Sequence, residues 1–305
     1  MNRFSYLLTM SLLTLLWMVS PAHAQFVHNG NLEANRLHYE QFAVQNGGHS
    51  VHLAYEDPFG FTTRASGGLL GNFWSESDQR FYTWGASVAH NFSQGGLFAT
   101  NHRVFTGTNF NSNPGEQYSV AEYFLHPGYT NIGGTQPDIA LFRLDVTLPI
   151  SNITVAPVNV GDRITYAGFG RPGTPATGLL PLDGFGRAFD VYVDDFGLGS
   201  SIADFYAESV FYPAGHSKFL PLGGLGTPGT SGAFGYNELG QLTTIAALAT
   251  TGTPSYFDAT YGVHISDPLI WNWWNATLPP AVPAPGAIAL FGVGAMLAGL
   301  RRRAS

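Results

Sequence analysis

The apolar pattern between residues 61 and 266 is a series of short hydrophobic stretches separated by turn residues. Glycine and proline are plentiful, with 38 and 19 residues, and aromatic residues make up 14% of the chain. Short β-branched and aromatic stretches between such turns are typical of strands, so we expect an all-β barrel or sandwich. The strands are predicted at 67–74, 80–90, 96–107, 117–126, 139–144, 163–170, 188–196, 242–250 and 260–266.

One segment near the end of this region has a helical pattern, "DPLIWNWWNA" at 267–276. Asp267 can cap the helix and Pro268 suits its first turn. Trp271, Trp273 and Trp274 are expected to pack the helix onto the barrel formed by the later strands. Residues 277–285 follow as a proline-rich linker.

The polar segment 25–60 carries scattered histidines that fit no element firmly. Their spacing matches no zinc motif, so we interpret them as part of a solvated loop and predict no metal site. Whether 25–60 acts as a propeptide stays open. The histidines are His28, His38, His49 and His52.

The two ends of the chain read as export signals. Residues 1–24 place an arginine before an apolar run and close on Ala22-His23-Ala24, the pattern of a secretory signal peptide. Near the C-terminus an apolar run from Gly286 to Leu300 is followed by three arginines, 301–303. This run is shorter than the roughly 20 residues of an independent membrane span.

Composition narrows the classes of function. The chain has 305 residues, only 11% of them charged, and its formal net charge is −7. Without the terminal segments, nine basic residues face twenty acidic ones, a net charge of −11. An acidic body argues against nucleic acid as a partner. The absence of cysteine excludes disulfides, thiolate catalysis and cysteine metal sites.

A serine stands in the glycine-rich stretch "GTSGAF" at 229–234. Nucleophilic catalysis needs a serine on a tight turn, a histidine to take its proton and a carboxylate to orient the histidine. Gly229 would let the backbone approach a substrate carbonyl, since it has no Cβ. By itself such a glycine-rich turn more often has only a structural role. The surrounding sequence has to show whether the serine is a nucleophile.

Several segments resemble the trypsin-like serine proteases. "HPGYTNIGGTQPDIALFRL" at 126–144 resembles the family's aspartate region and puts the aspartate at Asp138. "SGGLLG" (66–71) and "WGASVAHNF" (84–92) resemble the segments around the family's histidine, here His90, with Ser66 and Asn91 where the family has cysteines. "YAGFG" (166–170) is similar to the start of the second barrel, and 250–266 to the C-terminal region.

This resemblance implies two six-stranded antiparallel β-barrels with a C-terminal helix, over residues 61–276. It implies a serine endopeptidase with His90, Asp138 and Ser231 as the catalytic triad, no cofactor, and a protein or peptide substrate. The backbone N–H groups of Gly229 and Ser231 would form the oxyanion hole. Leu225 maps to the floor of the specificity pocket and Gly252 and Gly262 to its walls, which predicts a hydrophobic rather than an Arg or Lys preference.

Two features of the sequence leave alternatives open, one for the catalytic base and one for the activity. His102 competes with His90 as the base, and we expect His102 to be an exposed strand residue instead. Thr230 replaces the family's aspartate that pairs with the N-terminus released on zymogen cleavage, and no activation site precedes the first barrel. A catalytically weak relative that serves as a surface or matrix binding module is therefore the second hypothesis, and an unrelated all-β adhesin the third.

The C-terminal segment 282–305 resembles the PEP-CTERM sorting signal of Gram-negative bacteria. Its Val282-Pro283-Ala284-Pro285 opening has alanine where the family motif has glutamate. The resemblance implies an extracytoplasmic protein, held transiently at the inner membrane, with signal peptidase and an exosortase as its processing partners.

Overall fold

The computed structural model describes residues 25–29, 32–45, 49–130, 135–198, 202–227, 230–249 and 255–279. The predicted signal peptide, the sorting segment, Gly229 and Gly252 lie outside these ranges. None of the helices within them has the length and apolarity needed to cross a membrane.

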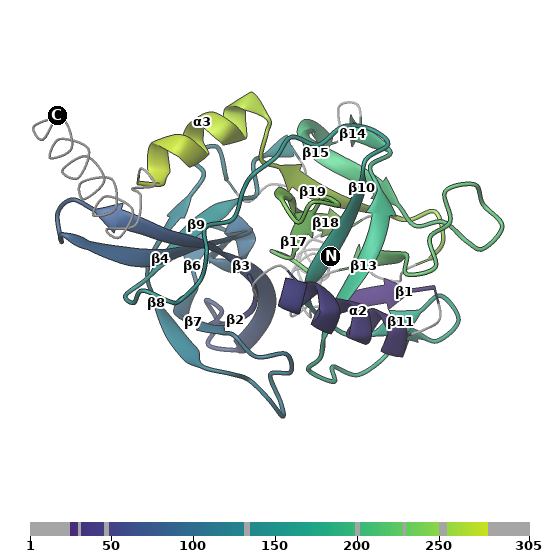
Figure 1. The fold of residues 1–305 in the computed structure, drawn as a ribbon, viewed down its shortest axis with the longest axis horizontal. Helices are drawn as coiled ribbons and strands as arrows, with labels where there is room; N and C mark the ends of the chain where they lie inside the picture. Colours follow the sequence, from purple (N-terminus) through teal and green to yellow (C-terminus); the bar gives the residue numbers. More distant parts are fainter. Residues whose placement is uncertain are drawn as a thin grey trace, which may run out of the picture.

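The first half of the chain forms a closed antiparallel barrel, on the left in Figure 1. Its core is built from apolar side chains that alternate along the strands, such as Leu53, Val104 and Phe142, all fully buried. The barrel strands, in spatial order, are β2 (Ser50–Glu56), β3 (Thr62–Ser75), β4 (Arg80–Ser87), β9 (Ala140–Leu144), β8 (Gln117–Leu125) and β7 (Thr100–Phe105).

The second half forms a seven-stranded antiparallel sheet. The predicted all-β fold class is confirmed, but this half has one strand more than the six expected, because the short β14 adds to the edge of β15. Its spatial order is β13 (Gly186–Tyr192), β10 (Arg163–Phe169), β17 (Phe234–Tyr236), β18 (Leu242–Ala249), β19 (Ala259–His264), β15 (Ile202–Val210) and β14 (Asp195–Leu198).

The two halves meet through close backbone contacts at the centre of the molecule. A Cβ on Gly68 of β3 would lie 2.2 Å from the ring of Phe234 of β17, so glycine is needed for this ring to fit. Ser66 reinforces the contact, because its hydroxyl donates to the carbonyl of Phe169 (3.0 Å) and accepts from the Phe169 amide (2.8 Å). These contacts hold the two halves against each other at this point.

The C-terminal helix α3 (Pro268–Thr277) forms as predicted. Asp267 caps it by accepting hydrogen bonds from the amides of Leu269 (2.8 Å) and Ile270 (3.4 Å). Ile270 and Trp274 are buried, while Trp271 remains 41% exposed. The helix lies over the upper side of the barrel strands in Figure 1.

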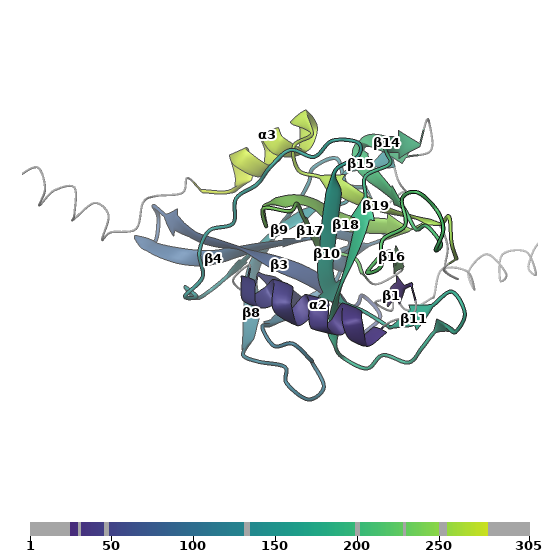
Figure 2. The ribbon, with the colours of Figure 1, turned by 45° about the vertical axis from the view of Figure 1, so that its right-hand side comes forward.

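The N-terminal segment is built into the body. Strand β1 (Gln25–His28) pairs antiparallel with β16 (Gly224–Thr227), and helix α2 (Leu32–Gln45) lies against β13, as Figure 2 shows. Asn35 is buried and its side-chain amide donates to the carbonyls of Ala188 (2.7 Å) and Leu222 (3.1 Å). Residues 50–56 are a barrel strand, so the barrel begins before residue 61.

The interpretation of the N-terminal histidines as part of a solvated loop is wrong. His28, His49 and His52 are buried, with exposures of 0, 5 and 2%. His52 stacks on Phe110 with ring centroids 4.5 Å apart, and burial next to Arg64 lowers the pKa of His52 to about 3. His28, His49 and His52 therefore pack as neutral aromatic rings. A sequence pattern in which histidine counts as a polar residue does not reveal this packing.

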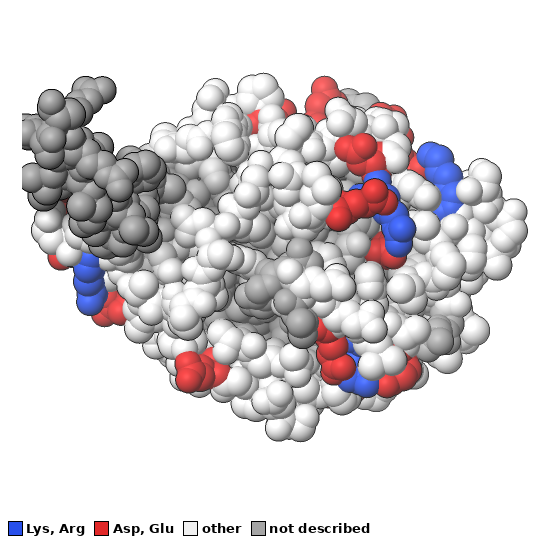
Figure 3. All heavy atoms as spheres, viewed as in Figure 1, with Lys and Arg blue, Asp and Glu red and all other residues white. Residues whose placement is uncertain are grey.

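Short elements complete the chain. The hairpins β5 (Ser93–Gln94) with β6 (Leu97–Phe98) and β11 (Gly173–Thr174) with β12 (Gly178–Leu179) project from the two halves. Figure 3 shows that the charged side chains of this face gather mainly at its right and lower edges, with a wide uncharged surface between them. This agrees with the low charged fraction.

We expect Asn35→Ala to lower the free energy of unfolding by about 1–2 kcal/mol, because the buried Ala188 carbonyl loses a donor and the Leu222 carbonyl keeps only the Asp190 amide. Urea unfolding followed by tryptophan fluorescence measures the change. Gln41→Ala, an exposed position on the same helix, is the matched control and should change stability by less than about 0.5 kcal/mol. Equal effects of the two substitutions would contradict the buried role of Asn35.

Candidate active site

His90 lies on a single helical turn at the end of β4. The turn, η1 (Ala89–Asn91), follows Val88, and both Val88 and Ala89 are fully buried. Burial of these two apolar neighbours holds the turn against the barrel. The His90 side chain itself is 21% exposed. Asp138 immediately precedes Ile139, which is also fully buried and carries the chain into β9.

The carboxylate of Asp138 holds His90 at two points. Asp138 Oδ2 lies 2.5 Å from His90 Nδ1, and Asp138 Oδ1 accepts a hydrogen bond of 2.9 Å from the backbone N–H of His90. A carboxylate held at both oxygens fixes both the plane and the tautomer of the ring, with the proton on Nδ1. Nε2 is then left as an acceptor.

Ser231 comes from the other half of the molecule. Its Oγ lies 2.7 Å from His90 Nε2, within hydrogen-bonding distance. Ser231 is 7% exposed, so the residue is largely buried beside the imidazole. The structure therefore brings together the three side chains that the sequence nominates for the triad, 48 and 93 positions apart along the chain.

The carbonyl of Ser231 is anchored to the first half by two donors. The Ser66 amide donates to it at 3.0 Å and the Asn91 side-chain amide at 3.2 Å. Asn91 also donates to Ser87 Oγ (2.9 Å), and Ser87 Oγ donates to the Ser66 carbonyl (2.8 Å). The sequence did not predict this positioning network, although Asn91 and Ser66, at two positions where the family that the sequence resembles has cysteines, were the available signal.

Gly232 is required by the same contact. It has φ +92°, and a Cβ there would lie 2.0 Å from the Ser66 carbonyl oxygen and 2.1 Å from Ser87 Oγ. Its amide donates to the carbonyl of Ala246 (2.8 Å), which ties the turn to β18. The glycine thus lets the serine turn approach the opposite half of the molecule.

The electrostatics of the site favour a basic imidazole. Burial by itself lowers the pKa of His90, but the charge of Asp138 and its hydrogen bond raise it, and the net effect is a raised pKa. The ring therefore gains affinity for a proton from the partner that orients it.

His102 is not an exposed strand residue, so that prediction is wrong. It is 7% exposed, stacks on Phe92 with centroids 4.5 Å apart, and its Nε2 lies 3.1 Å from the Asn91 carbonyl oxygen. A neighbouring aromatic cluster at the end of the barrel buries it. The ring beside Ser231 is that of His90.

The predicted pocket residues are not drawn into this arrangement. Leu225 is fully buried and packs with Phe211. Gly262 lies in β19 facing the hydroxyl of Tyr166, which would be 2.2 Å from a Cβ at this position. Gly229 and Gly252 lie outside the described residues, so the substrate pocket and the first oxyanion donor stay predictions. Among the described residues no group of three metal-ligating side chains occurs.

Comparisons with known proteins bear on the fold. No family model and no curated protein matches the sequence. Among solved structures, neuropsin, a serine protease of mouse brain, aligns with TM-score 0.52 and 16% identity over 74% of this chain and 93% of its own.

Two further structures align comparably. The protease Anisep from Arthrobacter nicotinovorans gives a TM-score of 0.53 at 13% identity, over 75% of this chain and 94% of its own. HL collagenase gives 0.55 at 13% identity, over 76% and 95%. The chain therefore has the trypsin-like serine protease fold.

We expect Gly232→Ala to lower the free energy of unfolding by about 3 kcal/mol or more, because the methyl group collides with the Ser66 carbonyl. Gly161→Ala is the matched control: it has the same φ of +92° but no atom within 4 Å of its Cβ. The control should cost only the backbone strain, about 1–2 kcal/mol. Chemical unfolding of both variants measures the difference, and equal losses would contradict the collision.

Proposed function

We propose that the protein is an exported serine endopeptidase in which Asp138, His90 and Ser231 form the catalytic triad. The observation that carries the proposal is the continuous pair of contacts from Asp138 Oδ2 to His90 Nδ1 and from His90 Nε2 to Ser231 Oγ. The fold shared with known proteases adds support.

The residue roles follow from this geometry. Ser231 Oγ attacks the substrate carbonyl while His90 Nε2 takes its proton and later gives it to the leaving amine. Asp138 keeps the proton of the neutral ring on Nδ1 and stabilises the charged ring during the reaction. The protein needs no cofactor for this chemistry.

The oxyanion formed by the attack requires preorganised donors. Within the described part of the chain, the Ser231 backbone N–H donates to no acceptor. We assign it and the Gly229 N–H to the oxyanion hole, each worth about 3 kcal/mol in the transition state. We propose a hydrophobic residue at the cleavage site from the sequence position of Leu225 alone, because this side chain is fully buried and packs with Phe211 in the structure.

We further propose that the enzyme acts outside the cytoplasm on a protein or peptide substrate. The N-terminal pattern of residues 1–24 supports export by signal peptidase. The segment 282–305 supports transient inner-membrane anchoring and release by an exosortase. No nucleic acid partner is expected, because the body is acidic.

Labelling by a fluorophosphonate probe tests the nucleophile. We expect labelling of the parent protein, none of Ser231→Ala, and a labelling rate about 10³–10⁴-fold lower for Asp138→Asn, because the ring loses its tautomer. Ser93→Ala, a buried serine in the short strand β5, is the control and should label normally. A folded parent protein that fails to label would support the binding-module hypothesis instead.

The raised pKa of His90 predicts the pH dependence. Only the neutral ring accepts the serine proton, so activity should rise with pH through a midpoint above the ordinary histidine value of 6.5. The Asp138 interaction stabilises the folded state fully below pH 6.5, and this contribution is lost as pH rises through the raised pKa.

NMR titration of the His90 ring in Ser231→Ala measures the pKa directly. Adding Asp138→Asn should lower the midpoint, because the attractive charge is removed while burial remains. A midpoint that stays unchanged would contradict the assigned cause.

A further inference from the structure

Two neighbouring strands of the closed first barrel, β7 and β8, are paired over only part of their length. The two strands pair only at Arg103 with Ser119, Val104 with Tyr118 and Phe105 with Gln117. Strand β8 then continues along β9 from Val120 to Leu125 without a partner on the β7 side among the described residues. The strands separate here and leave two facing edges of backbone.

Both edges carry a bulge at the point of separation. Asn101 adds a residue to β7 relative to β2 and has a left-handed backbone, with φ +52°. Its side chain donates to Glu56 Oε2 at 2.7 Å. On β8, Ala121 is the extra residue relative to β9. Bulges of this kind bend strands and are frequent near functional sites. The opening therefore results from the backbone geometry of both strands.

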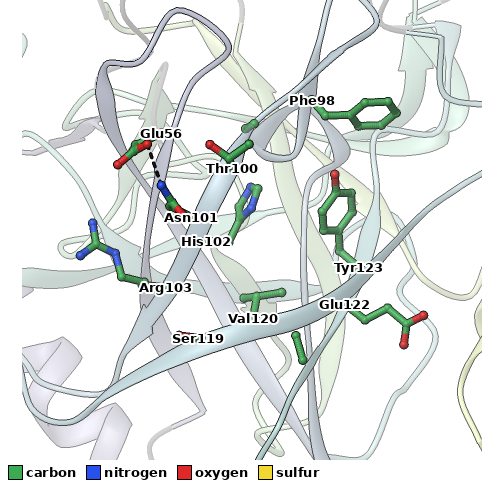
Figure 4. A pocket seen from close by; sticks show the side chains of 12 residues that line it. Glu56, Phe98, Thr100, Asn101, His102, Arg103, Ser119, Val120, Glu122 and Tyr123 are labelled. Carbon is green, nitrogen blue, oxygen red and sulfur yellow. Dashed lines mark hydrogen bonds between the residues drawn. The ribbon is translucent and has the colours of Figure 1, made fainter.

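A pocket of about 760 Å³ fills the opening (Figure 4). Glu56 and Asn101 lie on one side of it and Tyr123 on the other, with the His102 ring between them. Phe98, which is 61% exposed, forms an apolar rim. The size is in the range of sites that bind small molecules or short peptides.

The ionic groups of the pocket are unevenly satisfied. Glu56 is hydrogen-bonded to Asn101, and Glu122 is paired with Arg143 at 3.4 Å. Arg103 forms no ion pair within the described residues, and its Nε is shielded from solvent without an acceptor. The Arg103 side chain as a whole is partly exposed, so a carboxylate of a ligand can pair with the guanidinium without displacing an existing partner, and it is the complementary group.

The floor of the pocket is linked to the candidate active site. His102 Nε2 contacts the Asn91 carbonyl at 3.1 Å, and the Asn91 side chain donates to the Ser231 carbonyl at 3.2 Å. Asn91 also follows His90 directly in the chain. An occupant of the pocket therefore lies one residue contact away from the network that positions the serine.

We propose that the gap between β7 and β8, called the β7–β8 seam, is a second peptide-binding site, separate from the candidate active site around Ser231. An extended segment of another polypeptide pairs its backbone with the facing edges of β7 and β8 and places an acidic side chain on Arg103. A peptide added as a strand forms hydrogen bonds with the unpaired backbone groups of both β7 and β8, which a compact ligand cannot do.

Binding is tested in the Ser231→Ala protein, so the result does not depend on the proposed protease activity. The probe is a fluorescein-labelled ten-residue peptide of alternating valine and serine with one central glutamate, followed by fluorescence anisotropy. We expect saturable binding, about tenfold weaker when the glutamate is replaced by glutamine or when Arg103→Gln is added, because one charged hydrogen bond is lost.

Ala121→Trp should abolish binding, because it fills the opening at an exposed position. Arg80→Gln and Val146→Trp are the matched controls on the same barrel, and neither should change the affinity. Hydrogen exchange with bound peptide should protect the amides of 100–102 and 120–124.

Three results would overturn the proposal. The first is the absence of saturable binding of the glutamate peptide to the folded parent. The second is equal affinity of the parent, Arg103→Gln and Ala121→Trp for it. The third is an equally tight complex with a peptide that carries lysine in place of glutamate.

Discussion

The arrangement of this site depends on one buried carbonyl, that of Ser231. It receives hydrogen bonds from the Ser66 amide and from the Asn91 side chain, both in the first half of the molecule. Each bond is worth about 1 kcal/mol net, and the loss of both donors would leave a buried acceptor unsatisfied at a larger cost. The nucleophile of one half is thereby fixed against the histidine of the other, where a shift of 1 Å would break the contact between Nε2 and Oγ.

This anchoring shows how a chain without cysteine can join its two halves at the site. Ser66 and Asn91, which stand where the family that the sequence resembles has cysteines, are joined through Ser87 by hydrogen bonds. Gly232 makes the close approach sterically possible. On the far side, β1 pairs with β16, the strand that precedes the serine turn, so this turn is flanked by anchored structure before and after it.

The sequence predicted what continuous apolar runs and short motifs encode. Strands such as 139–144 and 242–250 match β9 and β18, because these strands are buried along most of their length and carry mostly apolar residues. Strand β2 and helix α2 were missed, since His52, Asn35 and His38 read as polar. Their burial depends on partners distant in the chain, such as Phe110, Ala188 and Asp190. No local pattern contains that information.

The same limit applies to His102, and it shows how the two sites are related. From the sequence alone, His102 can be a catalytic base or an exposed polar residue. In the structure its ring is packed against Phe92 and lies between the β7–β8 seam and Asn91. Asn91 in turn contacts the serine carbonyl through its side chain. A ligand that moves the His102 ring would therefore act on the geometry of Ser231 through a single shared residue. Because packed rings and satisfied hydrogen bonds have few alternative arrangements, such a movement would change the nucleophile position in discrete steps.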